Sequence, residues 1–180
     1  MSSTSGAIFA GGKSSRFGSP KISALIDDRS FGERIIATLR ESQIRDLFIV
    51  GGSPDTAELL GADFVEDAFV DSGPFGALIS VMRVCKTSNI LILPCDVPFI
   101  DQETCDALIE FDDKYEVQVA STDSPQWLCS IWKTATLPTL EMRFTEGERA
   151  IHKVASTLKL RFVAVSTRAL RNVNAPTDLE

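Results

Sequence analysis

The feature that most constrains this chain is an apolar segment near its N-terminus that leads directly into a glycine-rich, basic loop. The run from Ala7 to Ala10 predicts a buried strand over residues 6–10, and Gly11 and Gly12 follow it immediately. Because glycine has no Cβ, its backbone can adopt positive φ and approach an anion closely. A strand that ends in such a loop is typical of the phosphate-binding edge of an α/β sheet. Three basic residues add positive charge to this loop: Lys13, Arg16 and Lys21.

Two common phosphate-binding motifs do not fit the loop. Gly12-Lys13-Ser14 has the ending of a P-loop, but that motif needs a glycine at position 7, where this chain has Ala7. The dinucleotide-binding fingerprint fails because neither Gly11 nor Gly12 begins a G-x-G-x-x-G sequence.

The chain after the loop alternates apolar runs with helical patterns, which predicts an α/β fold with a mostly parallel sheet covered on both faces. Strands are predicted over 46–50, 64–65 and 89–94, and helices over 31–42, 55–60, 76–86 and 102–111. Ser30 and Glu33 have the spacing of a capping box, and Asp101 is a predicted N-cap. After residue 111 the pattern predicts strands over 116–122, 128–132, 160–165 and 172–174, a turn at 123–125, and helices over 134–143 and 147–157.

Composition limits the function classes. A chain of 180 residues without a linker or repeat predicts one domain, and a net charge of −7 argues against a general nucleic-acid binder. No signal-peptide pattern and no apolar stretch of about 18 residues is present, so we expect a cytoplasmic protein that does not use a membrane. The four cysteines lack C-x-x-C spacing and predict free thiols. A single histidine, His152, excludes a multi-histidine metal site and argues against a histidine-dependent hydrolase.

Two segments together resemble a known family. Phe9–Lys21 resembles the signature L-A-G-G-x-S-x-R-M-G-x-x-K of the molybdenum cofactor guanylyltransferases (the MobA family), and Pro94–Ile100 resembles their P-C-D-x-P-F-L segment. The resemblance implies a Rossmann-like, three-layer α/β/α fold of the nucleotide-diphospho-sugar-transferase type. It implies one nucleotidyltransferase domain over 1–180, with a nucleotide-binding half (1–100) and an acceptor-binding half (101–180). The implied reaction transfers GMP from GTP to the terminal phosphate of molybdopterin and releases pyrophosphate.

Asp96 is the candidate metal ligand. It follows the strand predicted over 89–94 and should emerge beside the glycine loop. From the local sequence, a turn aspartate and a Mg²⁺ ligand fit equally well, and the resemblance implies the ligand. The resemblance also assigns catalytic roles to Arg16, Lys21 and Asp96. The residues that it implies for contact with the nucleotide and its Mg²⁺ are Phe9, Ala10, Gly11, Gly12, Lys21, Asp67, Gly73, Asp96 and Asn174.

Supporting segments have weaker motifs. Gly73–Leu78 resembles the family segment G-P-L-x-x-L, and Asn172–Leu179 resembles N-x-N-T-P-E-D-L. Asp67 falls where the family has a nucleotide-contacting aspartate. A solvated strand end is the alternative interpretation of Asp67, and Asp71 competes for the role.

Three features depart from the family pattern or stay open. Gly51-Gly52 stands where the family often has an asparagine that helps to read guanine, and Trp127 replaces an expected proline or small residue in the segment that meets the pterin. Arg149 either binds the acceptor phosphate or faces solvent. Base choice is therefore less determined than reaction type.

The alternatives are a cytidylyltransferase for molybdopterin or another small phosphate, a sugar-phosphate nucleotidyltransferase, and a non-catalytic nucleotide-binding regulator. The sugar-phosphate enzymes often carry a further domain, which this sequence does not show. As partners, the resemblance implies GTP and molybdopterin, transient contact with other molybdenum cofactor synthesis proteins or recipient molybdoenzymes, and neither nucleic acid nor membrane.

Overall fold

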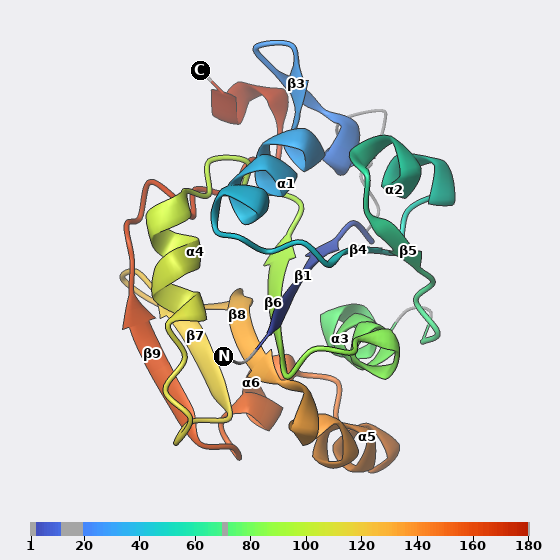
Figure 1. Cartoon of the computed structure of the whole chain (residues 1–180), viewed down its shortest axis with the longest axis vertical. Helices are drawn as coiled ribbons and strands as arrows, with labels where there is room; N and C mark the ends of the chain where they lie inside the picture. The colour runs from blue at the N-terminus through green and yellow to red at the C-terminus, as the bar shows by residue number, and fades with distance from the viewer. Residues whose placement is uncertain (1–2, 12–19, 70–71, 180) are drawn as a thin grey trace.

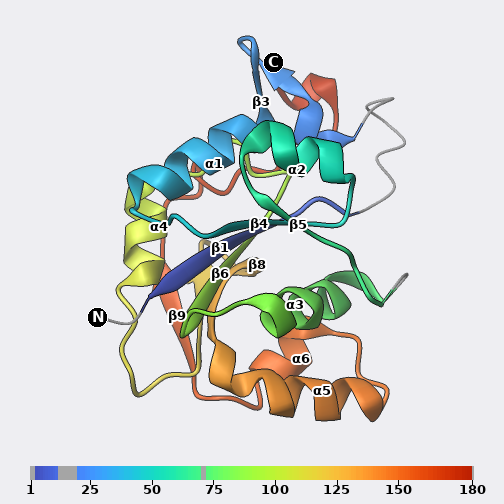
Figure 2. The ribbon, with the colours of Figure 1, turned by 45° about the vertical axis from the view of Figure 1, so that its right-hand side comes forward.

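The computed structural model describes residues 3–11, 20–69 and 72–179, and these residues form three layers, with a sheet between two layers of helices (Figures 1 and 2). The strand order of the seven-stranded sheet in this part of the chain is β5-β4-β1-β6-β8-β7-β9. Its strands are β1 (Thr4–Phe9), β4 (Leu47–Val50), β5 (Asp63–Val65), β6 (Asn89–Pro94), β7 (Val117–Ser121), β8 (Pro125–Lys133) and β9 (Leu160–Ala164). The predicted α/β architecture is thus confirmed.

The directions of the strands place the loops that follow β1 and β6 at the same edge of the sheet. β8 pairs antiparallel with both β6 and β7, and every other pairing in this sheet is parallel. The carboxyl ends of the six remaining strands therefore share one edge. A separate small hairpin, β2 (Leu25–Ile26) with β3 (Arg29–Ser30), lies beyond this edge, beside the C-terminal turn (Figure 1).

The helices divide between the two faces, as Figure 2 shows. One face carries α1 (Phe31–Glu41), α2 (Pro54–Leu60) and α4 (Gln102–Ile109), whose apolar side chains pack on Ile8, Ile49 and Leu91. The other carries α3 (Gly73–Val84), α5 (Leu137–Thr145) and α6 (Ile151–Ala155), which pack with Ala7, Ile90 and Trp132. Successive residues of a strand point to opposite faces, so both β1 and β6 contribute to both cores. Among the described residues, no helix is long and apolar enough to cross a membrane.

The N-caps predicted for α1 and α4 are confirmed. The Ser30 hydroxyl accepts the Glu33 N–H at 3.1 Å, while the Glu33 carboxylate accepts the Ser30 N–H at 2.6 Å, which completes the capping box of α1. The Ser30 N–H, by donating to the carboxylate, lowers the pKa of Glu33. Asp101 caps α4 by accepting the Thr104 N–H at 2.9 Å. Each cap satisfies a backbone donor that the helix itself leaves unpaired.

The second half of the chain differs from the sequence expectation in several details. Residues 172–174 form no strand, because the Val173 and Asn174 N–H groups bond to Asp96 and Asp178 instead of a neighbouring strand. β8 begins at Pro125, inside the predicted turn. The helix predicted over 147–157 is the shorter α6, since Gly147 has φ +96° and cannot start it. Residues 134–136 form a 3₁₀ turn before α5, which carries a proline in its first turn.

The strand order reverses beside β1. From β1 the chain moves outward through β4 to β5, then returns to the opposite side of β1 as β6. Phe9 and Pro94 are paired at the ends of β1 and β6, and the Cys95 N–H donates to the Phe9 carbonyl at 3.2 Å. Ligands of open α/β sheets bind outside the strand ends at such a reversal. The fold therefore puts the residues after Phe9 and after Pro94 at the preferred ligand site.

Candidate functional site

Three of the predicted site residues meet at this reversal, although they are far apart in the sequence. The Lys21 Nζ donates to the Asn174 Oδ1 at 2.7 Å and lies 3.3 Å from the Asp96 Oδ2. The side chains of Lys21 and Asp96 are 18% and 24% exposed, so their ion pair is partly shielded from water. Such shielding makes a charged contact stronger than one at the open surface. The cluster is a charged site at the edge of the sheet, where a ligand can reach it.

Asp96 is held at the strand end by its neighbours. Cys95 is buried, while the Asp96 carbonyl accepts the Val173 N–H at 2.8 Å. β6 is apolar and buried on both faces over most of its length, as central strands of parallel sheets are. Asp96 is thus the first acidic residue beyond the core, on a backbone fixed on both sides.

Lys21 is positioned by the short 3₁₀ turn Lys21–Ser23. Ile22 in this turn is 2% exposed, and the Ala24 N–H donates to the Lys21 carbonyl at 3.0 Å. Ala24 then packs with Phe31 and Val173 in a small separate core. The backbones that carry Lys21 and Asn174 are therefore anchored on the same apolar cluster.

The Gly51-Gly52 bend after β4 lies against the backbone of residues 10–11, which follow β1. The Ala10 N–H donates to the Val50 carbonyl at 2.9 Å, and Gly51 and Gly52 have φ of +74° and +77°. A Cβ on Gly51 would lie 3.2 Å from both the Cα and the N of Gly11, while one on Gly52 would meet the Ala10 Cβ at 3.5 Å. Gly51 therefore lets this bend touch the Gly11 backbone with no side chain between them. Gly11 itself is exposed, and a Cβ there would meet no atom of the described residues within 4 Å.

Gly12 and Arg16 lie outside the described residues, as do Lys13 and Asp71. Their predicted roles stay predictions. Phe9, by contrast, is the last residue of β1 and is 7% exposed, so any contact that it makes with a ligand is through its exposed edge or backbone.

Asp67 lies between β5 and α3, and Gly73 is the first residue of α3. The Asp67 Oδ1 accepts the Phe69 N–H at 3.0 Å and the Ser80 hydroxyl at 3.5 Å. Gly73 begins α3 with φ +68°, a conformation that favours glycine. None of the described hydrogen bonds joins Asp67 to Lys21, Asp96 or Asn174. The structure thus leaves the predicted nucleotide contact of Asp67 untested.

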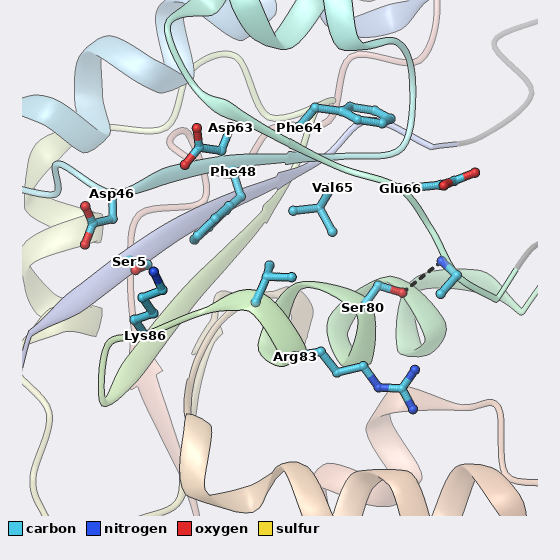
Figure 3. A pocket seen from close by; sticks show the side chains of 12 residues that line it. Ser5, Asp46, Phe48, Asp63, Phe64, Val65, Glu66, Ser80, Arg83 and Lys86 are labelled. Carbon is cyan, nitrogen blue, oxygen red and sulfur yellow. Dashed lines mark hydrogen bonds between the residues drawn. The ribbon is translucent and has the colours of Figure 1, made fainter.

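A groove of about 740 Å³ runs between β5 and α3 (Figure 3). Phe48 and Val65 line its middle, and charged residues such as Asp46, Glu66 and Lys86 line its ends. The Ser80 hydroxyl closes one end by accepting the Ala68 N–H at 3.1 Å, the dashed line in Figure 3. Lys21, Asp96 and Asn174 are not among its described lining residues, so this groove is separate from the candidate site.

The residues present fit a Mg²⁺ ion that is shared with a bound triphosphate. An ammonium group already lies between a carboxylate oxygen of Asp96 and an amide oxygen of Asn174, so the position favours a cation. Both groups are hard oxygen donors. Among the described residues, no group of three or more acidic, histidine or cysteine residues could hold a metal by itself. Mg²⁺ in nucleotide sites typically uses one or two carboxylates and takes its other ligands from phosphates and water.

The three buried cysteines, Cys95, Cys105 and Cys129, do not provide a nucleophile at neutral pH. Burial, with a smaller contribution from the Asp96 charge, raises the pKa of Cys95 to about 11. Burial also raises the pKa of Cys105 to about 12 and the pKa of Cys129 further. The four thiols are free, as predicted, and Cys95 beside Asp96 is a neutral core residue.

The structure locates Trp127 and Arg149, whose roles the sequence left open. Val119 pairs with Ser130 and Ala120 with Gln126, so residues 127–129 bulge out of the sheet, and the Trp127 ring lies near the rings of His152 and Phe162 at 5.9 and 5.8 Å. The Arg149 guanidinium stacks over the Phe144 ring at 3.8 Å and donates to the Phe144 carbonyl at 2.6 Å. Arg149 is therefore engaged by its own neighbours in this conformation.

The sequence interpretation gave no role to Asp178. Its Oδ2 accepts the N–H groups of Asn174 and Ala175 at 2.6 and 2.9 Å, and these two bonds lower its pKa. The spacing Asn174-x-x-x-Asp178, which suits a carboxylate that reaches back to a turn, is the sequence signal that could have revealed this contact.

Comparison with known proteins places the chain in a family. Residues 6–162 match the family model described as "MobA-like NTP transferase domain". Two relatives carry the name "Probable molybdenum cofactor guanylyltransferase". The protein from Geobacillus sp. (strain WCH70) is 26% identical over 193 residues, with 100% of this chain and 98% of the relative covered. The protein from Aquifex aeolicus (strain VF5) is 27% identical over 176 residues, with 96% and 87% covered.

Solved structures share the fold. "Molybdopterin-guanine dinucleotide biosynthesis protein A" from Archaeoglobus fulgidus has a TM-score of 0.77 at 20% identity, with 97% of this chain and 94% of that chain covered. The 2-C-methyl-D-erythritol 4-phosphate cytidylyltransferase from Thermus thermophilus has a TM-score of 0.73 at 13% identity, with 96% and 94% covered. Because the family model spans most of the sequence, the chain belongs to the MobA-like NTP transferase domain family and is a nucleotidyltransferase of that family.

Proposed function

We propose that the protein transfers GMP from GTP to the terminal phosphate of molybdopterin, with release of pyrophosphate, in molybdenum cofactor synthesis. The observation that carries the proposal is the cluster of Lys21, Asp96 and Asn174 at the strand reversal, where β1 also ends and leads to the exposed Gly11. The names of the two guanylyltransferase relatives, which align over nearly the whole chain, support the choice of nucleotide and acceptor.

The reaction requires charge neutralisation more than proton transfer. The acceptor phosphate is already anionic at pH 7, so no general base is needed to create the nucleophile. The difficulty is to bring two polyanions together and to stabilise the charge that develops as pyrophosphate leaves. Positioning and preorganised donors supply most of the catalysis in phosphoryl transfer, and we expect the same for nucleotidyl transfer.

The site residues that the structure describes have proposed roles that follow from their geometry. The Gly11 backbone, open to solvent and free of a side chain, approaches the triphosphate. Lys21 supplies a fixed cation whose direction is set by Asn174 and Asp96. Asp96 and Asn174 would hold Mg²⁺, which supplies charge neutralisation at the phosphate oxygens when bound. Arg16 and Gly12 keep their predicted roles as a phosphate cation and a loop donor.

Two alternatives follow from specific observations. A cytidylyltransferase is the first, because an enzyme of that class shares the fold at a TM-score of 0.73, and because the Gly51-Gly52 turn offers no side chain for reading guanine. The second is a non-catalytic nucleotide-binding regulator. The close Lys21–Asp96 pair argues against this second alternative, because a protein that only binds needs no cation poised for a leaving group.

The test is pyrophosphate release with GTP, CTP, ATP and UTP in turn, each with Mg²⁺, with and without molybdopterin or its molybdenum-loaded form. We expect release with GTP that depends on the acceptor. A preference for CTP would replace the guanylyl assignment with the cytidylyl one. Binding of GTP, measured by calorimetry, without turnover on either form of the acceptor would contradict the proposed reaction. A panel of other phosphorylated acceptors would then separate a wrong acceptor from a binding protein.

A further inference from the structure

The C-terminal segment carries Asn174, one of the three site residues, yet neither a strand nor a long helix holds this residue in place. Asn174 lies in a segment without secondary structure, followed by the 3₁₀ turn Pro176–Leu179. Its side chain nevertheless makes a 2.7 Å bond to the Lys21 Nζ, across 153 residues of sequence. Something other than secondary structure must fix the orientation of Asn174.

Two anchors fix the position of the segment before Asn174. The Val173 N–H donates to the Asp96 carbonyl at 2.8 Å. The Val173 side chain is 0% exposed and packs with Ala24 and Phe31. These contacts locate residue 173, but rotation about the backbone after Val173 would still swing the Asn174 side chain away from Lys21.

Asp178 supplies the missing constraint. One oxygen, Oδ2, accepts the N–H groups of both Asn174 and Ala175, at 2.6 and 2.9 Å. These two N–H groups belong to the peptides on either side of the Asn174 Cα, so their bonds to a single oxygen restrain φ and ψ of Asn174. The backbone of Asn174 in turn sets the direction of its side chain toward Lys21.

We propose that Asp178 is a positioning residue of the active site, which orients Asn174 and through it Lys21 by accepting these two N–H groups. This inference rests on the proposed function, because the orientation matters only if the three-residue cluster handles nucleotide and metal. Asp178 touches neither Lys21 nor Asp96 in the described hydrogen bonds, so it acts through Asn174. Partners that orient the groups in direct contact with a metal or substrate typically contribute 10- to 100-fold in metal affinity or activity.

The experiment compares Asp178→Ala with Asp178→Asn. The asparagine keeps one acceptor oxygen, which is all that the observed geometry uses, but it removes the charge. Asp112→Ala is the matched control. The Asp112 Oδ1 accepts the Lys114 N–H at 3.0 Å, in the loop that leads into the amino end of β7 and hence at the opposite edge of the sheet.

The first measurement needs no turnover. In a ¹⁵N NMR spectrum, the Asn174 side-chain amide should have the same chemical shifts in D178N and in D112A as in the wild type. In D178A these shifts should move to random-coil values. Native shifts in D178A would overturn the inference, whether or not the protein proves to be a guanylyltransferase.

The second measurement is kinetic. We expect D178A to lower kcat by about 10- to 100-fold with the KM for the acceptor changed less than about 3-fold, and to weaken binding of Mn²⁺, used as a probe for Mg²⁺, by a similar factor. D178N and D112A should stay within about 3-fold of wild type. Equal losses in D178A and D178N would show that the charge matters rather than the two hydrogen bonds, and would refute the positioning role. A wild-type protein that turns over no nucleotide would count against the proposed function, and the NMR comparison would still decide the role of Asp178.

Discussion

Replacing Gly51 by alanine tests whether the contact between Gly51 and the Gly11 backbone shapes the nucleotide site. Gly51 has φ +74°, and a Cβ there would lie 3.2 Å from the Cα and the N of Gly11. Carbon atoms in ordinary contact are about 3.5–4.0 Å apart. The Gly11 backbone cannot rotate away as a flexible side chain would, so it must shift by a few tenths of an ångström.

Gly52→Ala is the matched control, because it shares the strain without the close contact. Gly52 has φ +77°, and its added Cβ would meet the Ala10 Cβ at 3.5 Å, an ordinary separation. Alanine in the left-handed region costs roughly 1–2 kcal/mol. The reduced entropy of the unfolded chain returns roughly 0.4–1 kcal/mol. Both variants should therefore lose about 1 kcal/mol of unfolding free energy in urea titrations.

The two variants should differ in catalytic rate. A misplacement well under 1 Å at a phosphate-binding backbone corresponds to about a tenfold loss of catalytic rate, since a full 1 Å can cost about 10²-fold. We therefore expect kcat for pyrophosphate release from bound GTP, measured with Mg²⁺, to fall about tenfold in G51A and less than about 3-fold in G52A. Equal kcat values in the two variants would show that the Gly51–Gly11 contact does not determine the loop geometry. Loss of stability well above 3 kcal/mol in both would show that the strain estimate itself is wrong.

Three further outcomes follow from the site and its surroundings. Lys21→Ala should lower kcat for pyrophosphate release by at least about 10²-fold, as the loss of other charge-stabilising donors does, and a variant with wild-type kcat would remove Lys21 from the mechanism. Asp96→Asn should raise the Mg²⁺ concentration for half-maximal activity at least about tenfold or abolish activity, and an unchanged Mg²⁺ titration would support the simple turn aspartate. Burial raises the pKa of Cys95 to about 11, so above pH 9 the folded state binds more protons than the unfolded state, and the unfolding free energy should fall as the pH rises from 9 to 11. The contribution of Cys95 to this fall is about 2–3 kcal/mol, and Cys95→Ala should show a correspondingly shallower decline in urea unfolding measured at pH 8 and pH 11.

Most of the local structure was predictable because its signals lie within a few residues of each other. The apolar runs of β1, β4 and β6 predict buried strands, and Ser30 with Glu33 predicts the start of α1. The place of Asp96 at the carboxyl edge follows from the same reasoning, since it directly follows an apolar strand of a parallel sheet. These inferences need only periodicity, capping and strand direction.

Some errors fall where a backbone group has a partner far away in the sequence. The strand predicted at 172–174 is absent partly because the Val173 N–H bonds to the Asp96 carbonyl, and no local pattern announces such a partner. The same is true of the bulge at 127–129, which turns Trp127 toward His152 and Phe162. A β-bulge depends on the register of the neighbouring strand, which the sequence of one strand does not specify.

The sequence by itself determined the α/β architecture, the glycine loop and the candidate side chains, because periodicity, glycine conformation and charge are properties of neighbouring residues. Only the tertiary structure decided which of those side chains meet. Lys21 lies 75 residues from Asp96 and 153 residues from Asn174, and their contact depends on strand order and on one buried valine. It also decided the role of Asp178, because a carboxylate orients a site only when the turn that it stabilises is folded against that site.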